Sequence, residues 1–371
     1  MLAWFATALG LNLFGCLMVA SAAQDAHGPW GLGAEARAQL LWTAIGLTVG
    51  LGAARVPSEW WKRLAVPSYA AALVVIVGMM ILAGTSLVPL RKGQANWLVL
   101  GGFQVQPVEF VKVAVLLGAA RLITAPGFEV RWLSHVLVAL GITALPAALI
   151  AREDLGSALT FPAVVLGMLL VAGMRWRHLA LLLVLGAGLL ATGLALLPKE
   201  GPKAYQYRRI QAWLHPDEYA LTEGYQTARS LSAIGSGRVL GKGWREGDQT
   251  RLGLIPEKHT DLISAVIGEE WGLVGLVAVL VAYGALLWIG LGMASHARDP
   301  FARLTISGTT CLITGQASLN LAVALGLMPV TGVTLPLISY GGSSLLGTWL
   351  ALGLAAAMAR PTAIQPSSST I

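Results

Sequence analysis

Long apolar segments alternate with short polar ones along most of this chain. About ten segments are apolar over the length that a helix needs to cross a membrane, which is about 20 residues. One long polar interval, from about 198 to 260, interrupts the series. The pattern predicts an all-α polytopic membrane protein with about ten transmembrane helices and one long loop between the seventh and the eighth. The predicted spans are 1–23, 38–54, 66–84, 107–124, 133–151, 157–173, 178–197, 262–294, 302–328 and 336–359.

The composition supports a membrane protein. Of 371 residues, 56% are hydrophobic and 12% are charged, whereas a soluble domain has about 25% charged residues. Cys16 and Cys311 lie in predicted spans far apart in the sequence, and we interpret them as packing residues rather than metal ligands or a disulfide. We find no nucleotide-binding loop and no zinc spacing. The basic residues are dispersed, so we expect no nucleic-acid partner.

The charges of the short loops predict the orientation. With a cytoplasmic N-terminus, the inner side holds ten Lys or Arg residues and the short outer loops hold four, which agrees with the positive-inside rule. The first span has no Lys or Arg before Arg37, which favours an uncleaved anchor over a signal peptide. The long loop is then extracytoplasmic, and the Ser- and Pro-rich tail 361–371 is expected to be a disordered cytoplasmic segment. The inner residues are Arg55, Lys62, Arg63, Arg121, Arg131, Arg175, Arg177, Arg298, Arg303 and Arg360, and the outer ones are Arg37, Arg91, Lys92 and Arg152.

The start of the eighth span has an unusual pattern of charges. A charged, Pro-containing stretch meets an apolar run at Asp261, so Thr260 or Asp261 is placed to cap the helix. Glu269 and Glu270 follow inside the hydrophobic zone. A carboxylate there costs about 2.5–3.5 kcal/mol, so such groups are normally paired or face a polar cavity. One carboxylate at the membrane surface with two more below it suggests a site.

Polar side chains also occur in other spans. Glu109 and Lys112 lie three residues apart, so they share a helix face and can pair. They form either a structural ion pair between helices or part of the wall of a polar cavity. Asp154, at the outer end of the sixth span, is either a helix cap or a ligand contact. Gln316 and Asn320 share a face of the ninth span, which is typical of hydrogen bonding between helices.

The outer loop combines basic and aromatic residues. The segment from Tyr205 to Leu214 predicts a short amphipathic helix on the membrane, basic on one side, which suits either anionic lipid headgroups or a ligand. The glycines near Ser236 and Lys242 can bring backbone N–H groups close to a phosphate, but glycine also serves plain turns. The small residues before the last span either allow close helix packing or break a helix beside a cavity.

Eight motifs occur in a characteristic order. They are Gln106-Pro-Val-Glu-Phe-Val-Lys112, Asp154-Leu-Gly156, Tyr225-Gln226, Ala233-Ile-Gly-Ser-Gly237, Gly241-Lys-Gly243, Pro256-Glu-Lys-His-Thr-Asp261, Glu269-Glu-Trp-Gly272 and Leu335-Pro-Leu-Ile-Ser-Tyr-Gly-Gly-Ser-Ser344. With these motifs the chain resembles the SEDS family (shape, elongation, division and sporulation) over nearly all its length. Glu257-Lys-His259 is more similar to the RodA branch than to the FtsW branch. The chain departs from the family pattern at Leu262-Ile-Ser264, where Phe-Ile-Phe is usual, and at Arg229-Ser230, where Gln-Ser is usual.

The resemblance implies a single SEDS-type transmembrane domain, 1–360, that acts as a peptidoglycan glycosyltransferase. Such an enzyme polymerises lipid II on the outer face of the bacterial inner membrane, here in cell elongation and shape maintenance, with a class B penicillin-binding protein (a transpeptidase) as partner. Asp261 is implied as the essential carboxylate, with Glu109 and Lys112 lining the central cavity. The further residues expected to bind substrate or line the cavity are Asp154, Arg209, Lys242, Lys258, His259, Thr260 and Ser339.

The expected chemistry is inverting transfer from a strand linked to undecaprenyl pyrophosphate, with one carboxylate as general base. Arg209, Lys242 and Lys258, or a divalent cation such as Mg²⁺ or Mn²⁺, would stabilise the leaving pyrophosphate. We expect no metal site made by the protein itself. Two rival functions are a lipid II flippase and a membrane scaffold that recruits cell-wall enzymes. The outward clustering of the acidic motif residues favours the polymerase.

Overall fold

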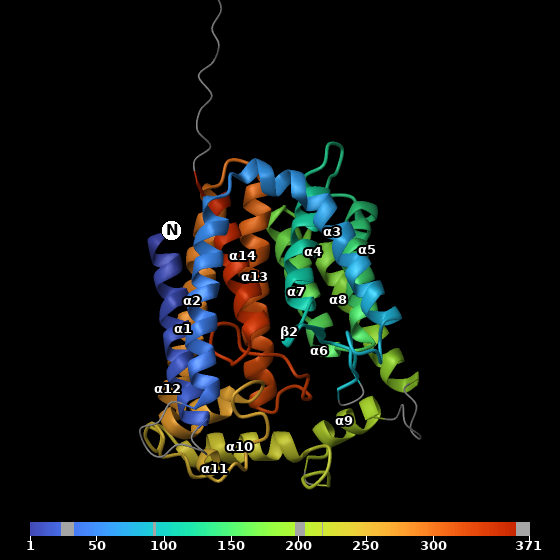
Figure 1. The fold of residues 1–371 in the computed structure, drawn as a ribbon. Helices are drawn as coiled ribbons and strands as arrows, with labels where there is room; N and C mark the ends of the chain where they lie inside the picture. The colour runs from blue at the N-terminus through green and yellow to red at the C-terminus, as the bar shows by residue number, and fades with distance from the viewer. Residues whose placement is uncertain (24–32, 92–93, 197–204, 217, 361–371) are drawn as a thin grey trace, which may run out of the picture.

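The computed structural model describes residues 1–23, 33–91, 94–196, 205–216 and 218–360. The predicted disordered tail (361–371), the first part of the outer loop (198–204) and Lys92 lie outside the described residues. Helices dominate the described chain, and most of them stand side by side in one bundle (Figure 1). The helices are α1 Leu2–Ala22, α2 Ala34–Arg55, α3 Ser58–Ile81, α4 Val108–Ile123, α5 Leu133–Ala151, α6 Leu155–Ala158, α7 Thr160–Val171, α8 Trp176–Leu196, α9 Tyr205–Leu214, α10 Tyr225–Gly237, α11 Asp248–Arg251, α12 Ile263–His296, α13 Pro300–Ala324 and α14 Gly342–Met358.

Helices α9, α10 and α11 lie across one end of the bundle, where they cover the start of α12 (Figure 1). The start of α1 and the end of α14 lie at the opposite end. The amphipathic helix predicted for the outer loop is confirmed as α9, with the same bounds.

A helix lies at each of the ten predicted spans, with two changes of shape. The sixth span consists of two helices, α6 and α7, which meet at Leu159. The tenth begins at Gly342 instead of residue 336, because the residues from 325 to 341 are not helical. Among the described residues, α1, α3, α5 and α12 are long and apolar enough to cross a membrane, and shorter apolar helices cover 155–171, 176–188 and 342–358. The chain is an integral membrane protein.

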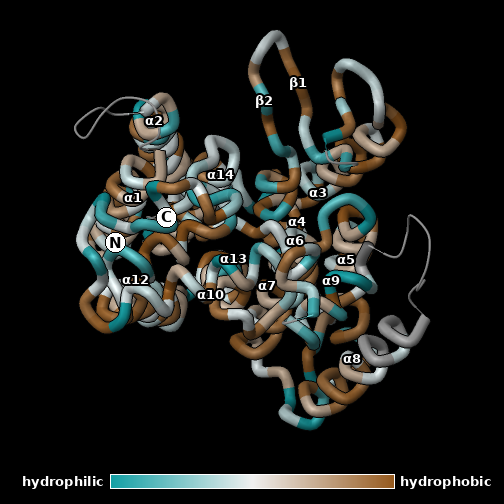
Figure 2. Tube along the Cα trace, turned by 90° about the horizontal axis from the view of Figure 1, so that it is seen from below, coloured by the Kyte–Doolittle hydropathy of each residue, from teal (hydrophilic) through white to brown (hydrophobic). Residues whose placement is uncertain are grey.

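A short β-hairpin joins α3 to α4, an addition to the predicted all-α fold. Strands β1 (Leu98–Leu100) and β2 (Phe103–Val105) pair antiparallel, with Leu100 opposite Phe103. The two-residue turn is Gly101-Gly102, and both glycines have positive φ, the backbone conformation that such tight turns require. The hairpin projects sideways beyond the helices (Figure 2).

The bundle core is built on close contacts between helices. The contact of α2 with α14 is one example, because a Cβ atom on Gly353 would collide with the backbone of Gly50. Trp349 of α14 is fully buried and packs against the same face of α2, where Gly46 leaves room for its ring. Small residues at such contacts let membrane helices approach closely. The core thereby fixes the ends of the helices that carry the polar motifs.

Candidate active site

Asp261 lies in the turn that leads into α12, and its side chain is half-buried. The N-cap residue of α12 is Leu262, so the expectation that Thr260 or Asp261 caps this helix is wrong. The reason is a turn in which Leu262 N–H donates to the carbonyl of Glu257, which makes the chain enter the helix one residue later. The carboxylate points instead toward the loop before α14: a Cβ atom on Gly332 would lie 3.7 Å from Asp261 Oδ2.

Asn320 of α13 fixes the backbone beside this carboxylate. Its Nδ2 donates to Asp261 O (2.8 Å) and to Val333 O (2.7 Å), and its Oδ1 accepts from the buried Ser264 hydroxyl. One amide side chain therefore joins the Asp261 segment, α12 and the loop before α14. The polar face predicted for α13 is confirmed: of the six hydrogen bonds of Gln316 and Asn320, two go to other helices, three go to this loop and one goes to Asp261 O.

Residues 330–341, which we call the central loop, bring together most of the predicted site residues. The Ser339 hydroxyl donates to Thr260 O (2.6 Å) and accepts from Leu335 N–H (2.8 Å). Tyr340 N–H donates to His259 O (2.8 Å), and the two rings meet edge to face. The central loop thus holds two predicted site residues next to Asp261: Ser339 binds Thr260, and its neighbour Tyr340 binds His259.

The Glu109–Lys112 pair is confirmed as an ion pair and lines a small cavity. Lys112 Nζ lies 2.8 Å from Glu109 Oε2 and donates to Gln316 Oε1 at 2.8 Å, and both charged side chains are buried. Gln316 Nε2 in turn donates to the carbonyl of Thr334 in the central loop (3.1 Å). The pair therefore connects to the same loop that surrounds Asp261. The cavity is lined by Glu109, Lys112, Leu312, Ile313, Gln316, Pro336, Gly347 and Thr348.

Asp154 acts as a helix cap. It is the N-cap residue of α6 and accepts from the backbone N–H (2.9 Å) and the hydroxyl (2.7 Å) of Ser157. A second, mostly apolar pocket opens beside it between α3, α4 and α5. Helix α6 packs on the central loop at Gly156, because a Cβ atom on Gly156 would collide with Thr331 O. Asp154 is thus linked to the site through the contact of α6 with the central loop.

The three predicted cations have different surroundings. Arg209 of α9 donates to Val330 O of the central loop at 3.0 Å. Lys258 is buried and donates to Thr250 O at 3.0 Å. Lys242 binds the carboxylates of Glu269 (2.8 Å) and Asp248 (3.0 Å). Burial lowers the pKa of Lys242, but the hydrogen bonds and charges of these two partners outweigh it and raise the pKa above its ordinary 10.5.

The glycine motif around Lys242 supplies backbone hydrogen-bond partners at a break in helix α12. Helix α12 is interrupted at Gly272, whose φ of 63° is the left-handed conformation that favours glycine. Residues 238–243 insert at this break, and four backbone hydrogen bonds of 2.9 to 3.1 Å join the two. They run from Leu273 N to Arg238 O, from Val274 N to Val239 O, from Lys242 N to Glu269 O and from Gly243 N to Glu270 O. The glycines could bind phosphate or form plain turns, and turn formation explains these contacts.

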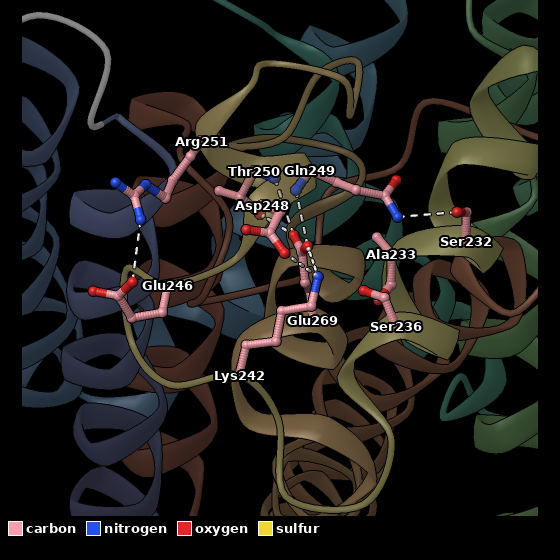
Figure 3. A network of polar contacts seen from close by, with 10 residues as sticks. All are labelled: Ser232, Ala233, Ser236, Lys242, Glu246, Asp248, Gln249, Thr250, Arg251 and Glu269. Atoms are coloured by element: carbon pink, nitrogen blue, oxygen red, sulfur yellow. Dashed lines mark hydrogen bonds and ion pairs between the residues drawn. The ribbon is translucent and has the colours of Figure 1, made fainter.

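The two carboxylates of α12 predicted below Asp261 bind the chain itself. Glu269 is completely buried and accepts hydrogen bonds from the loop 242–250 (Figure 3). Glu270 accepts a hydrogen bond from the hydroxyl of Ser21 at the end of α1. Sequence reasoning identified these carboxylates as unusual, but it missed the central loop, which it assigned in part to a helix. The only available signal was the Gly-Gly pair, which was compatible with a broken helix.

Comparisons with known proteins agree with this arrangement. The family model FTSW_RODA_SPOVE, described as "Cell cycle protein", matches residues 1–363. The chain belongs to this family. A relative from Trichlorobacter lovleyi, named probable peptidoglycan glycosyltransferase FtsW, is 35% identical over 93% of the chain and 89% of its own length. The peptidoglycan glycosyltransferase MrdB of Escherichia coli K12 is 33% identical over 84% of the chain and 82% of its own length.

Solved structures of the family share the fold. One, described as "Structural coordination of polymerization and crosslinking by a peptidoglycan synthase complex", has a TM-score of 0.77 and 32% identity and covers 97% of both chains. The rod shape determining protein RodA of Thermus thermophilus has a TM-score of 0.66 and 29% identity, over 96% of this chain and 95% of its own. Relatives of both names, FtsW and RodA, therefore lie at similar distances from this chain.

Proposed function

We propose that this peptidoglycan glycosyltransferase polymerises lipid II into glycan strands and that Asp261 is its general base. The observation that carries the proposal is the position of Asp261: a half-buried carboxylate on an irregular segment, held by Asn320 and bordered by Gly332 of the central loop. A general base must reach the hydroxyl that it deprotonates, and an exposed end of a helix bundle gives a membrane-bound sugar that access. The 4-hydroxyl of the incoming sugar would lose its proton to Asp261 as it attacks the donor.

For the leaving pyrophosphate we propose Arg209 and Lys258 as the stabilising cations. Arg209 reaches the central loop at Val330, and Lys258 lies three residues before Asp261. Lys242 already binds two carboxylates, so we assign its charge to holding the loop and not to the pyrophosphate. Among the described residues, no three His, Cys, Asp or Glu side chains gather as a metal site. A divalent cation at the pyrophosphate would thus be held largely by phosphate oxygens.

The experiment that tests Asp261 uses the purified protein, alone and with a class B penicillin-binding protein, and labelled lipid II. We expect Asp261→Asn to express and melt like the parent while making no glycan strands. Melting should be unchanged because asparagine has nearly the same size as aspartate and keeps an oxygen that accepts hydrogen bonds. Strand synthesis near the parent rate would refute the assignment. Transport of lipid II between leaflets without strand synthesis by the parent protein would favour the flippase.

We also propose ten spans, an extracytoplasmic 205–260 region and a bacterial inner-membrane location. The support is the charge asymmetry of the loops and the position of α9, α10 and α11 at the end opposite the start of α1. Leu221 is 89% exposed, so Leu221→Cys should react with an impermeant thiol reagent in spheroplasts. Arg131 is also exposed and belongs to the connection between α4 and α5, which lies at the other end of the bundle (Figure 1), so Arg131→Cys should react only after permeabilisation. The reverse pattern would invert the topology.

We propose an elongation role, a class B penicillin-binding protein as partner and one domain covering 1–360. The elongation role rests on Glu257-Lys-His259, which resembles the RodA branch. The partner proposal is supported by the related structure of a peptidoglycan synthase complex. Expression in RodA-depleted cells should restore the rod shape. Rescue of FtsW-depleted cells alone would assign the chain to division.

A further inference from the structure

The carboxylate of Glu269 is a buried charge with several hydrogen bonds. It is 0% exposed and accepts four hydrogen bonds, all from one short loop (Figure 3). The donors are Lys242 Nζ (2.8 Å), Gln249 N–H (2.9 Å), Thr250 N–H (3.0 Å) and the Thr250 hydroxyl (2.8 Å). Hydrogen bonds to an ionised acceptor are stronger than neutral ones, so this carboxylate fixes the loop 242–250 on α12.

Thr250 connects this loop to the segment that carries Asp261. Thr250 is buried, and while its N–H and hydroxyl bind Glu269, its carbonyl accepts from Lys258 Nζ at 3.0 Å. Lys258 is itself buried and stands three residues before Asp261. An unbroken series of contacts therefore runs from Glu269 through Thr250 and Lys258 to the segment that carries Asp261.

We propose that Thr250 is a positioning residue for glycosyl transfer: it holds Lys258, and hence the Asp261 segment, at a fixed place relative to α12. The proposal rests on the proposed role of Asp261. Asp261 lies on a turn, where no helix ladder holds it, so its place depends on contacts such as this one and the Ser339–Thr260 hydrogen bond on the other side. Reacting groups tolerate little displacement, since a misplacement of about 1 Å can lower a rate about 100-fold.

The kinetic test compares two substitutions of one hydroxyl. Thr250→Val removes the hydroxyl donor to Glu269 and keeps the size of the side chain, while Thr250→Ser keeps the donor. We expect Thr250→Val to lower kcat about tenfold and to change KM for lipid II less than about twofold, and Thr250→Ser to restore most of kcat. Glu246→Gln is the matched control, because it breaks the exposed Glu246–Arg251 pair of the same loop, which does not touch Glu269. The control should keep the parent rate.

A second measurement does not depend on activity. Hydrogen–deuterium exchange of peptides covering 254–262 reports the turn in which Thr260 N–H and Leu262 N–H both donate to Glu257 O. Thr250→Val and Lys258→Met should raise exchange there by at least about threefold, and Thr250→Ser and Glu246→Gln should leave it unchanged. Unchanged exchange in Thr250→Val, or loss of activity in Thr250→Ser equal to that in Thr250→Val, would overturn the proposal.

The two proposals fail in different ways. Asp261→Asn should abolish strand synthesis and leave exchange in 254–262 as in the parent. If Asp261→Asn were active, the assignment of the base would fail, while the exchange data would still decide whether Thr250 holds the segment. If Thr250→Val altered exchange but not kcat, Thr250 would be a structural residue only.

Discussion

Two carboxylate–ammonium pairs in this protein, each with a buried carboxylate, have the same N–O distance and different roles. Glu109–Lys112 and Glu269–Lys242 both have N–O distances of 2.8 Å. The first is made within α4 by residues three apart, and its spare hydrogen bond goes to Gln316 beside a small cavity. The second joins a helix to a loop 27 residues earlier in the chain.

The difference lies in what else the carboxylate binds. Glu269 also accepts from two backbone N–H groups and one hydroxyl, so it fixes the course of the main chain. The main-chain contacts of Glu109 are those of its helix. A buried pair can thus either line a polar space or fasten two segments, and the backbone donors distinguish the two cases.

The largest expected effect is the loss of one carboxylate. Glu269→Ala leaves two backbone N–H groups and a hydroxyl without their acceptor, at about 1–3 kcal/mol for each of the three, while Lys242 keeps Asp248. Glu109→Ala leaves only the buried Lys112 ammonium without its carboxylate, which costs about 3–5 kcal/mol. Lys112 keeps Gln316, so the total should be smaller than for the three donors lost at Glu269. Melting followed by size-exclusion chromatography of the detergent-solubilised variants measures both. Equal losses would remove the distinction between the pairs.

Exchanging the charges sharpens the comparison. Glu109→Lys combined with Lys112→Glu should recover part of the expression lost in the single variants, because both residues belong to one helix face. Glu269→Lys combined with Lys242→Glu should recover none, since an ammonium at position 269 would face two backbone N–H donors. Expression level in matched membranes is the readout, and recovery in both exchanges would contradict our account of Glu269.

The smallest effect is expected at an exposed reference pair, Arg208–Glu223, at 2.6 Å. A backbone N–H hydrogen bond lowers the pKa of Glu223 below its ordinary 4.5, burial opposes this, and Arg208 lowers it further. A lowered folded pKa stabilises the fold above pH 4.5, and this contribution disappears as the pH falls through the folded pKa. Arg208→Met should cost at most about 1 kcal/mol at neutral pH, and the difference from the parent should vanish in melting curves at low pH. A difference that persisted there would point to lost packing.

Local patterns predicted the local features of the molecule. The spans follow from apolar length, α9 from its amphipathic period, and Glu109–Lys112 from the three-residue spacing. The central loop did not follow, because an apolar run such as 335–341 matches a buried helix as well as an irregular segment. Its structure depends on hydrogen-bond donors from distant helices, including Asn12, which donates to Leu337 O, and Gln39, which donates to Ser339 O.

The candidate site was predicted in part. Asp261, Thr260, His259 and Ser339 could be grouped only through resemblance, since 79 residues separate Ser339 from Thr260. The capping interpretation of Asp261 was wrong because a residue pattern does not reveal where a turn enters a helix. The role of Lys242 depended on a tertiary contact that no spacing rule includes.

The break in α12 also marks depth in the membrane. From Leu273 to His296 the helix has about 24 residues, which at 1.5 Å per residue is about 36 Å and exceeds a hydrocarbon core of about 30 Å. The part below Gly272, from Ile263 to Trp271, is then not needed to cross the lipid. In the proposed topology it would stand in the headgroup layer, where α10 packs against it. A lipid-linked sugar has its pyrophosphate in that same layer, so the proposed substrate, diffusing in the plane of the membrane, would meet Asp261 without leaving its own depth.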